Sequence, residues 1–134
     1  MKTPLARLLL CVAAAALAVS LRAQTANGYY RFPAIHGDTI VFTAEGDLWR
    51  VAAAGGTAQR LTSHPGQETS PAISHDGKWV AFSAQYERSN EVYVMPLTGG
   101  LPKRLTFEGE SALVRGWAPG GRVLYSTAAY STLP

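Results

Sequence analysis

Cysteine is nearly absent from this chain of 134 residues, because Cys11 is the single example. Cys11 lies inside an apolar run and follows Leu10, where a lipid-attachment site would want a small residue. We interpret it as a small hydrophobic residue in a segment that is later removed. The remaining chain then has no disulfide framework, so apolar burial and strand pairing are expected to hold it together.

No apolar run in the N-terminal region is long enough to cross a bilayer. The run over 8–19 has twelve residues, fewer than the roughly 20 that a spanning helix needs. Lys2 and Arg7 precede it, and small and polar residues ending at Ala23 follow it. This pattern predicts a signal peptide over 1–23, export to the periplasm or medium, and no membrane association after cleavage. A retained anchor is the alternative.

Several site classes lack their signatures. Removing 1–23 takes away three of the 12 basic residues, which leaves 9 basic against 9 acidic and indicates no nucleic-acid partner. Metal sites need several ligands at set spacing, and no His-x-x-x-His motif or acidic cluster occurs. The glycine pairs at 55–56 and 120–121 precede no helix that begins with Lys-Ser or Lys-Thr, so they predict turns. We predict no metal site and no cofactor.

An internal repeat dominates the rest of the chain. Residues 33–62 recur as 71–106, with Pro-Ala-Ile, a Phe, Gly-Gly and Arg-Leu-Thr in the same order at offsets of 38, 40, 44 and 44 residues. A third copy begins near Val114, where 121–126 resembles 77–83. Short strand-like runs with a period of roughly 40–45 residues are typical of β-propeller blades.

The repeat predicts an all-β chain built from propeller blades. After a lead-in over 24–32, we expect a partial propeller over 33–134. Its complete four-stranded blades cover about 33–64 and 69–108, and a truncated third blade covers 112–134. A closed propeller needs about four to eight blades, so this chain is expected to supply only part of one.

The second strand of each copy is apolar on both faces. Strands are predicted over 38–43 and 78–84, because both are rich in β-branched and aromatic residues. In the second copy, alternation places Val80, Phe82 and Ala84 on one face. The opposite face carries Trp79, Ala81 and Ser83. Stacked blades bury both faces of a sheet, which explains this pattern better than a free hairpin.

The outer strands of each copy also match. Strands over 47–51 and 91–95 each open on an acid and carry an aromatic third residue. Last strands are expected over 58–62 and 102–106. The basic residues in these last strands suit a solvent-facing outer edge, namely Arg60, Lys103 and Arg104.

Three features suggest chemistry but have a structural explanation. Ser74, His75 and Asp76 are neighbours in a turn, and a triad cannot form from neighbours in a tight turn. His36 and His64 are expected in loops. Recurring aromatic residues are expected to pack between blades rather than to stack on bases or sugars. These are Trp49, Trp79, Tyr93 and Trp117. An apolar edge at 123–125 is expected to be exposed and prone to aggregation.

The repeats resemble those of the TolB and tricorn-protease group. The resemblance lies in the Ser-x-Asp-Gly-Lys turn at 74–78, the strand at 91–94 and the Gly-Gly-x-Pro-x-Arg-Leu-Thr segment at 99–106. Departures are His75, where the group usually has Pro, and Gly120, where it usually has Asp. Both lie in turns and leave the fold expectation unchanged.

A finer resemblance is to bacterial tricorn-like proteases. It lies in 28–33 directly after the signal peptide, in 46–49 and in 115–117, and it covers the chain from about Gly28 to Pro134. It implies the N-terminal part of a large serine peptidase, in which propellers channel or filter peptides and a PDZ module and catalytic region follow. The implied partners are a peptide or protein substrate and the remaining blades and catalytic domains. The family's nucleophile and base lie far downstream, so no catalytic residue is assigned in this chain.

A second hypothesis is a non-enzymatic envelope propeller of the TolB kind, which mediates protein–protein interactions. TolB-type proteins place an α/β domain before the blades, whereas about ten residues separate Ala23 from Pro33 here. This spacing favours the peptidase hypothesis. If any residues touch a ligand, we expect them near 34–36 and 72–74, because the inner strand of each blade lines the channel.

Overall fold

A computed structural model describes residues 29–130, which form three antiparallel sheets. The first contains β1 (Arg31–His36), β2 (Thr39–Ala44), β3 (Asp47–Ala52) and β4 (Gln59–Arg60). The second contains β5 (Glu68–Ile73), β6 (Trp79–Ala84), β7 (Glu91–Pro96) and β8 (Lys103–Arg104). The third pairs β9 (Ala112–Ala118) with β10 (Arg122–Thr127). We call the first two sheets blade 1 and blade 2.

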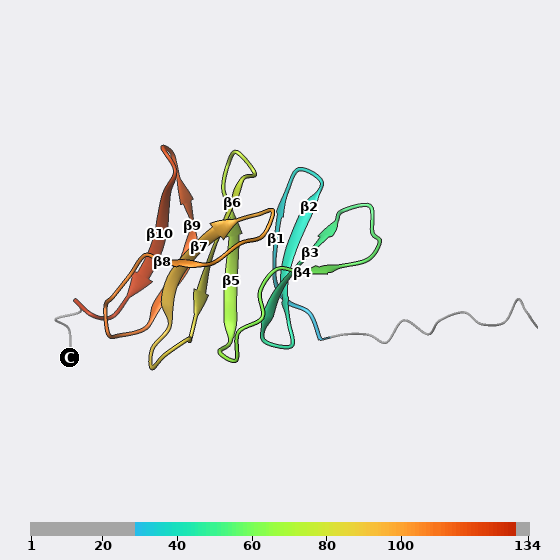
Figure 1. Cartoon of the computed structure of the whole chain (residues 1–134). Helices are drawn as coiled ribbons and strands as arrows, with labels where there is room; N and C mark the ends of the chain where they lie inside the picture. The colour runs from blue at the N-terminus through green and yellow to red at the C-terminus, as the bar shows by residue number, and fades with distance from the viewer. Residues whose placement is uncertain (1–28, 131–134) are drawn as a thin grey trace, which may run out of the picture.

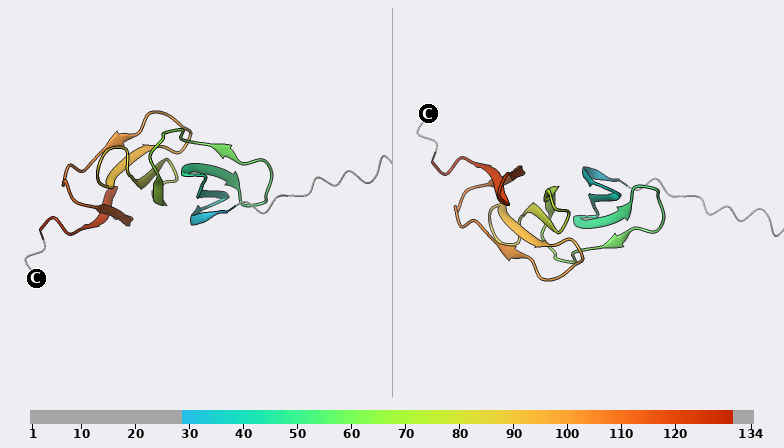
Figure 2. Two further views of the ribbon diagram at one scale, coloured as in Figure 1. Left: turned by 90° about the horizontal axis from the view of Figure 1, so that it is seen from below. Right: turned by 90° about the horizontal axis from the view of Figure 1, so that it is seen from above.

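The predicted blade architecture is confirmed. Each four-stranded sheet keeps its strands in chain order, and the three sheets stand side by side (Figure 1). Viewed along the strands, they form an arc with β1, β5 and β9 on one side and β4 and β8 on the other (Figure 2). We call β1, β5 and β9 the inner strands. Residues 29–130 contain no helix that is long and apolar enough to span a bilayer.

The predicted signal peptide over 1–23 lies outside the described residues and stays a prediction. So does most of the lead-in that we expect over 24–32, of which only 29–32 are described.

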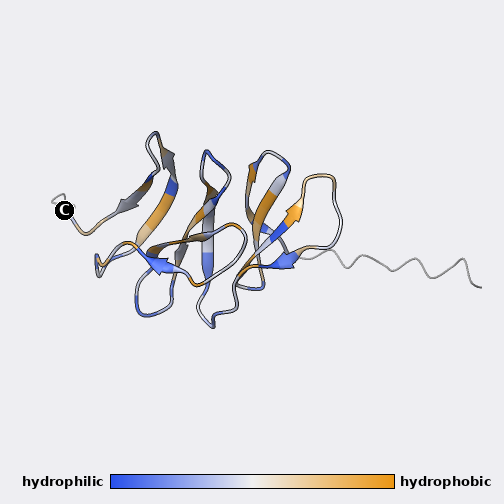
Figure 3. Ribbon diagram, turned by 45° about the horizontal axis from the view of Figure 1, so that its top comes forward, coloured by the Kyte–Doolittle hydropathy of each residue, from blue (hydrophilic) through white to orange (hydrophobic). Residues whose placement is uncertain are grey.

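Both faces of β6 are buried, as its sequence predicts. Val80 and Phe82 belong to an apolar cluster with Val41 and Leu48 of blade 1. Ala81 belongs to a second cluster with residues of β7 and β9. Blade 2 is therefore packed on both sides, and the apolar segments lie along the central strands of the sheets (Figure 3). The buried apolar faces hold the blades together through the hydrophobic effect.

A tight hairpin joins β2 to β3. Glu45 and Gly46 form its loop with φ angles of 55° and 91°. Two consecutive positive φ angles match the twist of a two-residue hairpin, and glycine accepts such an angle without steric cost. Glu45 and Gly46 thus form a two-residue loop between the paired residues Ala44 and Asp47.

The last strand of each blade is shorter than expected. β4 and β8 have two residues each, whereas the sequence predicts five-residue strands over 58–62 and 102–106. One more backbone hydrogen bond follows β4, from the Leu61 N–H to the Leu48 carbonyl at 2.8 Å. The Thr62 hydroxyl then accepts a hydrogen bond from the Leu48 N–H at 2.9 Å. Thr106 does the same for the Val92 N–H at 2.9 Å.

Candidate functional site

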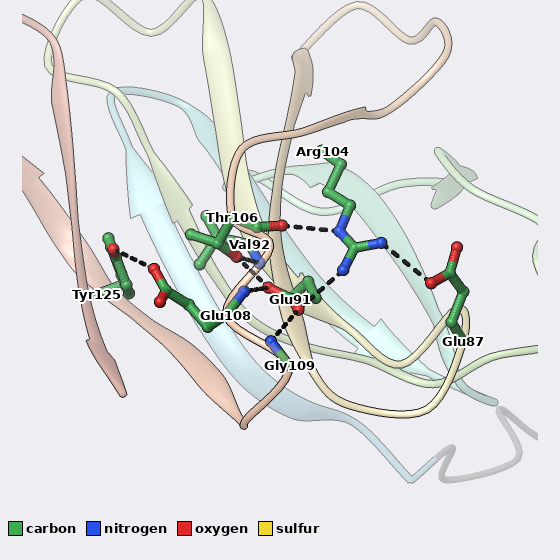
Figure 4. A network of polar contacts seen from close by, with 8 residues as sticks. All are labelled: Glu87, Glu91, Val92, Arg104, Thr106, Glu108, Gly109 and Tyr125. Carbon is green, nitrogen blue, oxygen red and sulfur yellow. Dashed lines mark hydrogen bonds and ion pairs between the residues drawn. The ribbon is translucent and has the colours of Figure 1, made fainter. Parts of the chain in front are cut away.

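The buried carboxylate of Glu91 is the centre of a polar network in blade 2 (Figure 4). Glu91 begins β7 and accepts hydrogen bonds from the Thr106 hydroxyl at 2.5 Å and from Arg104 Nη2 at 2.8 Å. The backbone N–H groups of Glu108 and Gly109 also point at this carboxylate, at 3.4 and 3.3 Å. Acid, arginine and threonine together fasten the short outer strand to β7. We call this group the blade 2 clasp.

Blade 1 has a corresponding clasp, and one residue of this clasp belongs to blade 2. Asp47 matches Glu91 in position but is one methylene shorter, and its carboxylate pairs with Arg60. Thr62 donates instead to Glu68, the first residue of β5, which also accepts the Leu48 N–H at 3.0 Å. Glu68 therefore ties blade 2 to blade 1.

The two buried glutamates have opposite electrostatic environments. Burial raises the pKa of Glu68, and the hydrogen bonds from Thr62, Tyr86 and the Leu48 N–H offset this only in part. Among the described residues, Glu68 has no ion-pair partner. Burial also acts to raise the pKa of Glu91, but the hydrogen bonds from Thr106 and Arg104 outweigh it and lower that pKa.

The clasps correct one expectation. Arg104 was expected at a solvent-facing edge, yet its side chain is only 22% exposed and bridges Glu91 and Glu87. Its Nε also donates to the Thr106 carbonyl at 2.7 Å. Arg60 is more exposed, at 50%. The Arg-Leu-Thr motif is therefore a structural fastening in both blades.

The Ser74-His75-Asp76 segment is a turn, as predicted. The Ser74 hydroxyl donates to Asp76 at 2.6 Å and accepts the Trp79 N–H at 2.9 Å, so both of its roles are local. Asp76 also accepts the Lys78 N–H at 3.1 Å. The hydrogen bond from Ser74 lowers the pKa of Asp76. Among residues 29–130, no serine or threonine hydroxyl is hydrogen-bonded to a histidine ring.

The two histidines thought to lie in loops differ. His64 lies in the β4–β5 loop, where its ring centroid is 3.9 Å from that of Tyr86 and its Nδ1 accepts the Gly66 N–H at 3.0 Å. His36 instead ends β1 and pairs with Thr39, so the loop expectation for it is wrong. The described part of the chain holds no group of three or more potential metal-ligating side chains.

Two of the four recurring aromatic residues pack between sheets. Tyr93 is buried in the first cluster. Trp117 packs against the second cluster and donates its indole N–H to the Ala72 carbonyl at 2.9 Å, from the third sheet to blade 2. Trp49 is half-buried and bonds within its own blade, to the Ala44 carbonyl at 3.1 Å. Trp79 is 43% exposed and lines a groove of about 740 Å³ between blade 2 and the third sheet, so the packing expectation fails there.

The inner strands share a feature that the sequence did not reveal. The pairing of β1 with β2 shifts within 31–34, and that of β5 with β6 shifts within 69–72. The pairing of β9 with β10 shifts within 114–116. Each inner strand therefore has one extra residue, a β-bulge. Bulges lie on one side of the arc, where the inner strands run next to one another (Figure 2).

Two of these bulges place a non-glycine residue at positive φ. Phe32 has a φ of 51° and Ser70 a φ of 52°, and each precedes a proline. Left-handed backbone is unfavourable for residues with a Cβ, and a proline restricts the residue before it toward extended conformations. Such strain is most common at functional positions. We therefore take the inner strands as the candidate functional site.

Three comparisons place this architecture among known proteins. The family described as the tricorn protease N-terminal beta propeller domain matches residues 27–133. Tricorn protease homolog 1 of Streptomyces coelicolor is 43% identical over 100 residues, which are 74% of this chain and 9% of that protein. The Tol-Pal system protein TolB of Desulfosudis oleivorans is 32% identical over 102 residues, which are 73% of this chain and 23% of that protein.

A solved structure has the same fold. The crystal structure of the tricorn protease superposes with a TM-score of 0.70 at 24% sequence identity, over 78% of this chain and 11% of that one. The chain therefore spans about a tenth of the length of Tricorn protease homolog 1 and of the tricorn protease in that crystal structure.

Proposed function

Because the chain belongs to the tricorn protease N-terminal beta propeller family, we propose that it is the N-terminal propeller portion of an exported serine peptidase. In this proposal the propeller channels or filters peptides on their way to a catalytic region elsewhere in the same protein. Its partners are the remaining blades, the catalytic domains and the peptide or protein substrate.

The observation that carries the proposal is the row of inner strands. β1, β5 and β9 lie on one side of the arc, and each has a bulge there. The described residues near these strands form clasps and turns. Within residues 29–130, no serine or threonine hydroxyl is hydrogen-bonded to a histidine that could act as its base. A role in access, with bond cleavage performed outside this chain, agrees with both features and with the much greater length of the tricorn relatives.

The TolB relatives support a second candidate. A propeller that mediates protein–protein interactions would need the same clasps and the same stacked blades, and the TolB of Desulfosudis oleivorans is 32% identical. Tricorn protease homolog 1 is 43% identical over a similar span. The higher identity favours the peptidase assignment.

The full-length gene product provides the functional test. We expect it to cleave unstructured peptides, to spare folded proteins, and to lose activity with a serine-reactive inhibitor. Deleting the propeller should relax the discrimination against folded proteins. A full-length product without peptidase activity that instead captures an envelope protein would support the second candidate. Unchanged discrimination after the deletion would refute the filter.

Export is tested separately. We propose cleavage near Ala23, so the N-terminus of the protein recovered from the periplasm or medium should begin close to Gln24. Recovery of the intact chain from the cytoplasm, beginning at Met1, would contradict export without affecting the family assignment.

A further inference from the structure

We infer that the bulge residues Phe32 and Ser70 turn their side chains toward the space beside the inner strands and are selectivity positions for a passing peptide. This inference rests on the proposed function. The two positions lie just before the segments at 34–36 and 72–74, where the sequence analysis expects ligand contacts.

The two bulge positions share a backbone conformation but differ in their side chains. Phe32 and Ser70 are separated by the repeat offset of 38 residues, and their φ angles differ by one degree. Their side chains, an aromatic ring and a hydroxyl, have almost nothing in common. A core position would hold its side-chain type to preserve packing. If each blade selects peptides differently at this position, the backbone conformation must stay the same while the side chain differs between blades, as it does here.

Neither side chain contributes to the interior of the blades. Phe32 is 42% exposed, and neither residue belongs to the two apolar clusters. Among the described residues, the Ser70 hydroxyl has no hydrogen-bond partner, whereas Ser74 and Ser83 both have one. Strain of this kind is energetically unfavourable at each position. No packing gain at Phe32 or Ser70 offsets that cost.

The bulge in β1 brings two successive side chains together. Successive residues of a regular strand point to opposite faces. Arg31 and Phe32 are successive, yet the Arg31 guanidinium carbon lies 5.6 Å from the centroid of the Phe32 ring. The Arg31 side chain therefore reaches its neighbour's ring, as can occur where an extra residue interrupts the alternation.

The prolines that follow define the kind of contact. Pro33 and Pro71 have no N–H group, so the inner edge cannot extend its hydrogen-bonded ladder at these points. A peptide is therefore touched by the side chains at 32 and 70 rather than captured by strand addition. Side-chain contact without backbone capture suits an extended peptide that must move on.

Photocrosslinking tests the inference on the full chain. The photoreactive substitution Phe32→p-benzoylphenylalanine, and the same change at Ser70, are compared with the same change at Phe107 and Leu101, which flank the outer strand β8 and are 75% and 92% exposed. The probe is a biotinylated, unstructured peptide of mixed composition. We expect severalfold higher yields from positions 32 and 70 than from the two control positions, despite the greater exposure of the controls.

The other outcomes distinguish a failure of this inference from a failure of the proposed function. The same probe is also placed at His36 and at Ala72. Crosslinks from these positions, with only control yields at 32 and 70, would overturn the bulge inference but would still support the peptide channel. No crosslink from any inner position would overturn both. A second readout avoids the bulky probe: peptide should slow thiol labelling of Ser70→Cys but not of Leu101→Cys. Equal labelling with and without peptide would also refute the inference.

Discussion

Replacing Glu91 with glutamine should destabilise the chain strongly, whereas the same change at Glu68 should not. Both glutamates are fully buried and both accept a threonine hydroxyl, but only Glu91 has an arginine partner. The pair therefore provides a matched comparison within one protein. It tests whether the clasps are held by ion pairing or only by hydrogen bonding.

The magnitude follows from the contacts that Glu91 loses. Its carboxylate accepts Thr106 at 2.5 Å and Arg104 at 2.8 Å. Hydrogen bonds to a charged group contribute about 1.5–3 kcal/mol each, and a buried donor left unsatisfied adds to the loss. An amide keeps one acceptor oxygen, so we expect Glu91→Gln to cost about 2–3 kcal/mol. That corresponds to a fall in melting temperature of about 10 °C or more.

The pH dependence of the two variants should be opposite. The folded-state pKa of Glu91 is lowered, so its contribution to stability is present above its ordinary pKa of 4.5 and is lost as the pH falls through the folded value. The folded-state pKa of Glu68 is raised, so its contribution is complete below 4.5 and is lost as the pH rises through the folded value. Glu68→Gln should therefore be neutral or stabilising at pH 7.

The assay is thermal and denaturant unfolding of the chain and both variants between pH 3 and pH 8. The cost of Glu91→Gln should shrink toward the acid end. The Tyr86 hydroxyl can accept from a glutamine amide at 68 as readily as it donates to the carboxylate. Equal losses for the two variants at pH 7, or a gain for Glu91→Gln, would refute the electrostatic distinction.

Four further substitutions test other parts of the structure. Ser70→Gly should leave stability unchanged or raise it by up to about 1 kcal/mol in unfolding experiments, because glycine relieves a positive φ; a clear loss would show that the Ser70 side chain is structural. Ser83→Ala should cost about 1–3 kcal/mol by leaving the buried Val114 N–H unpaired, whereas Thr43→Val, at a buried hydroxyl without a partner, should cost nothing; the reverse order would contradict these assignments. Leu124→Lys should reduce aggregation measured by light scattering, because Leu124 is 49% exposed on β10; unchanged scattering would exclude this edge as the cause.

The blades could be predicted because their determinants are local and repeated. Alternation in β6 assigns Val80 and Phe82 to one side and Ala81 to the other, and both clusters confirm it. The expected exposure near 123–125 is confirmed for Leu124 and Tyr125, which are 49% and 40% exposed, whereas Val123 packs against the second cluster.

The clasps were missed although their signal is present. An acid, an arginine and a threonine recur at the same offset of 44 residues, from Asp47 to Glu91 and from 60–62 to 104–106. Equal spacing of opposite charges across a repeat indicates a pair. The role of Glu68 could not be read in this way, because it depends on how far Asp47 reaches and on which blade lies next to it.

The bulges could not be predicted from local preference. The dipeptides Phe32-Pro33 and Ser70-Pro71 favour extended backbone at the first residue. Positive φ arises there because the inner strand carries one residue more than its partner between fixed pairings. Only the register of the whole hairpin imposes that conformation.

The central claim is that this propeller serves a peptidase, and the most direct measurement is the genomic DNA sequence beyond the codon for Pro134. We predict an open reading frame that continues through further blades into a PDZ module and a serine-peptidase region. A frame that stops after a few more blades, without a peptidase region, would contradict it.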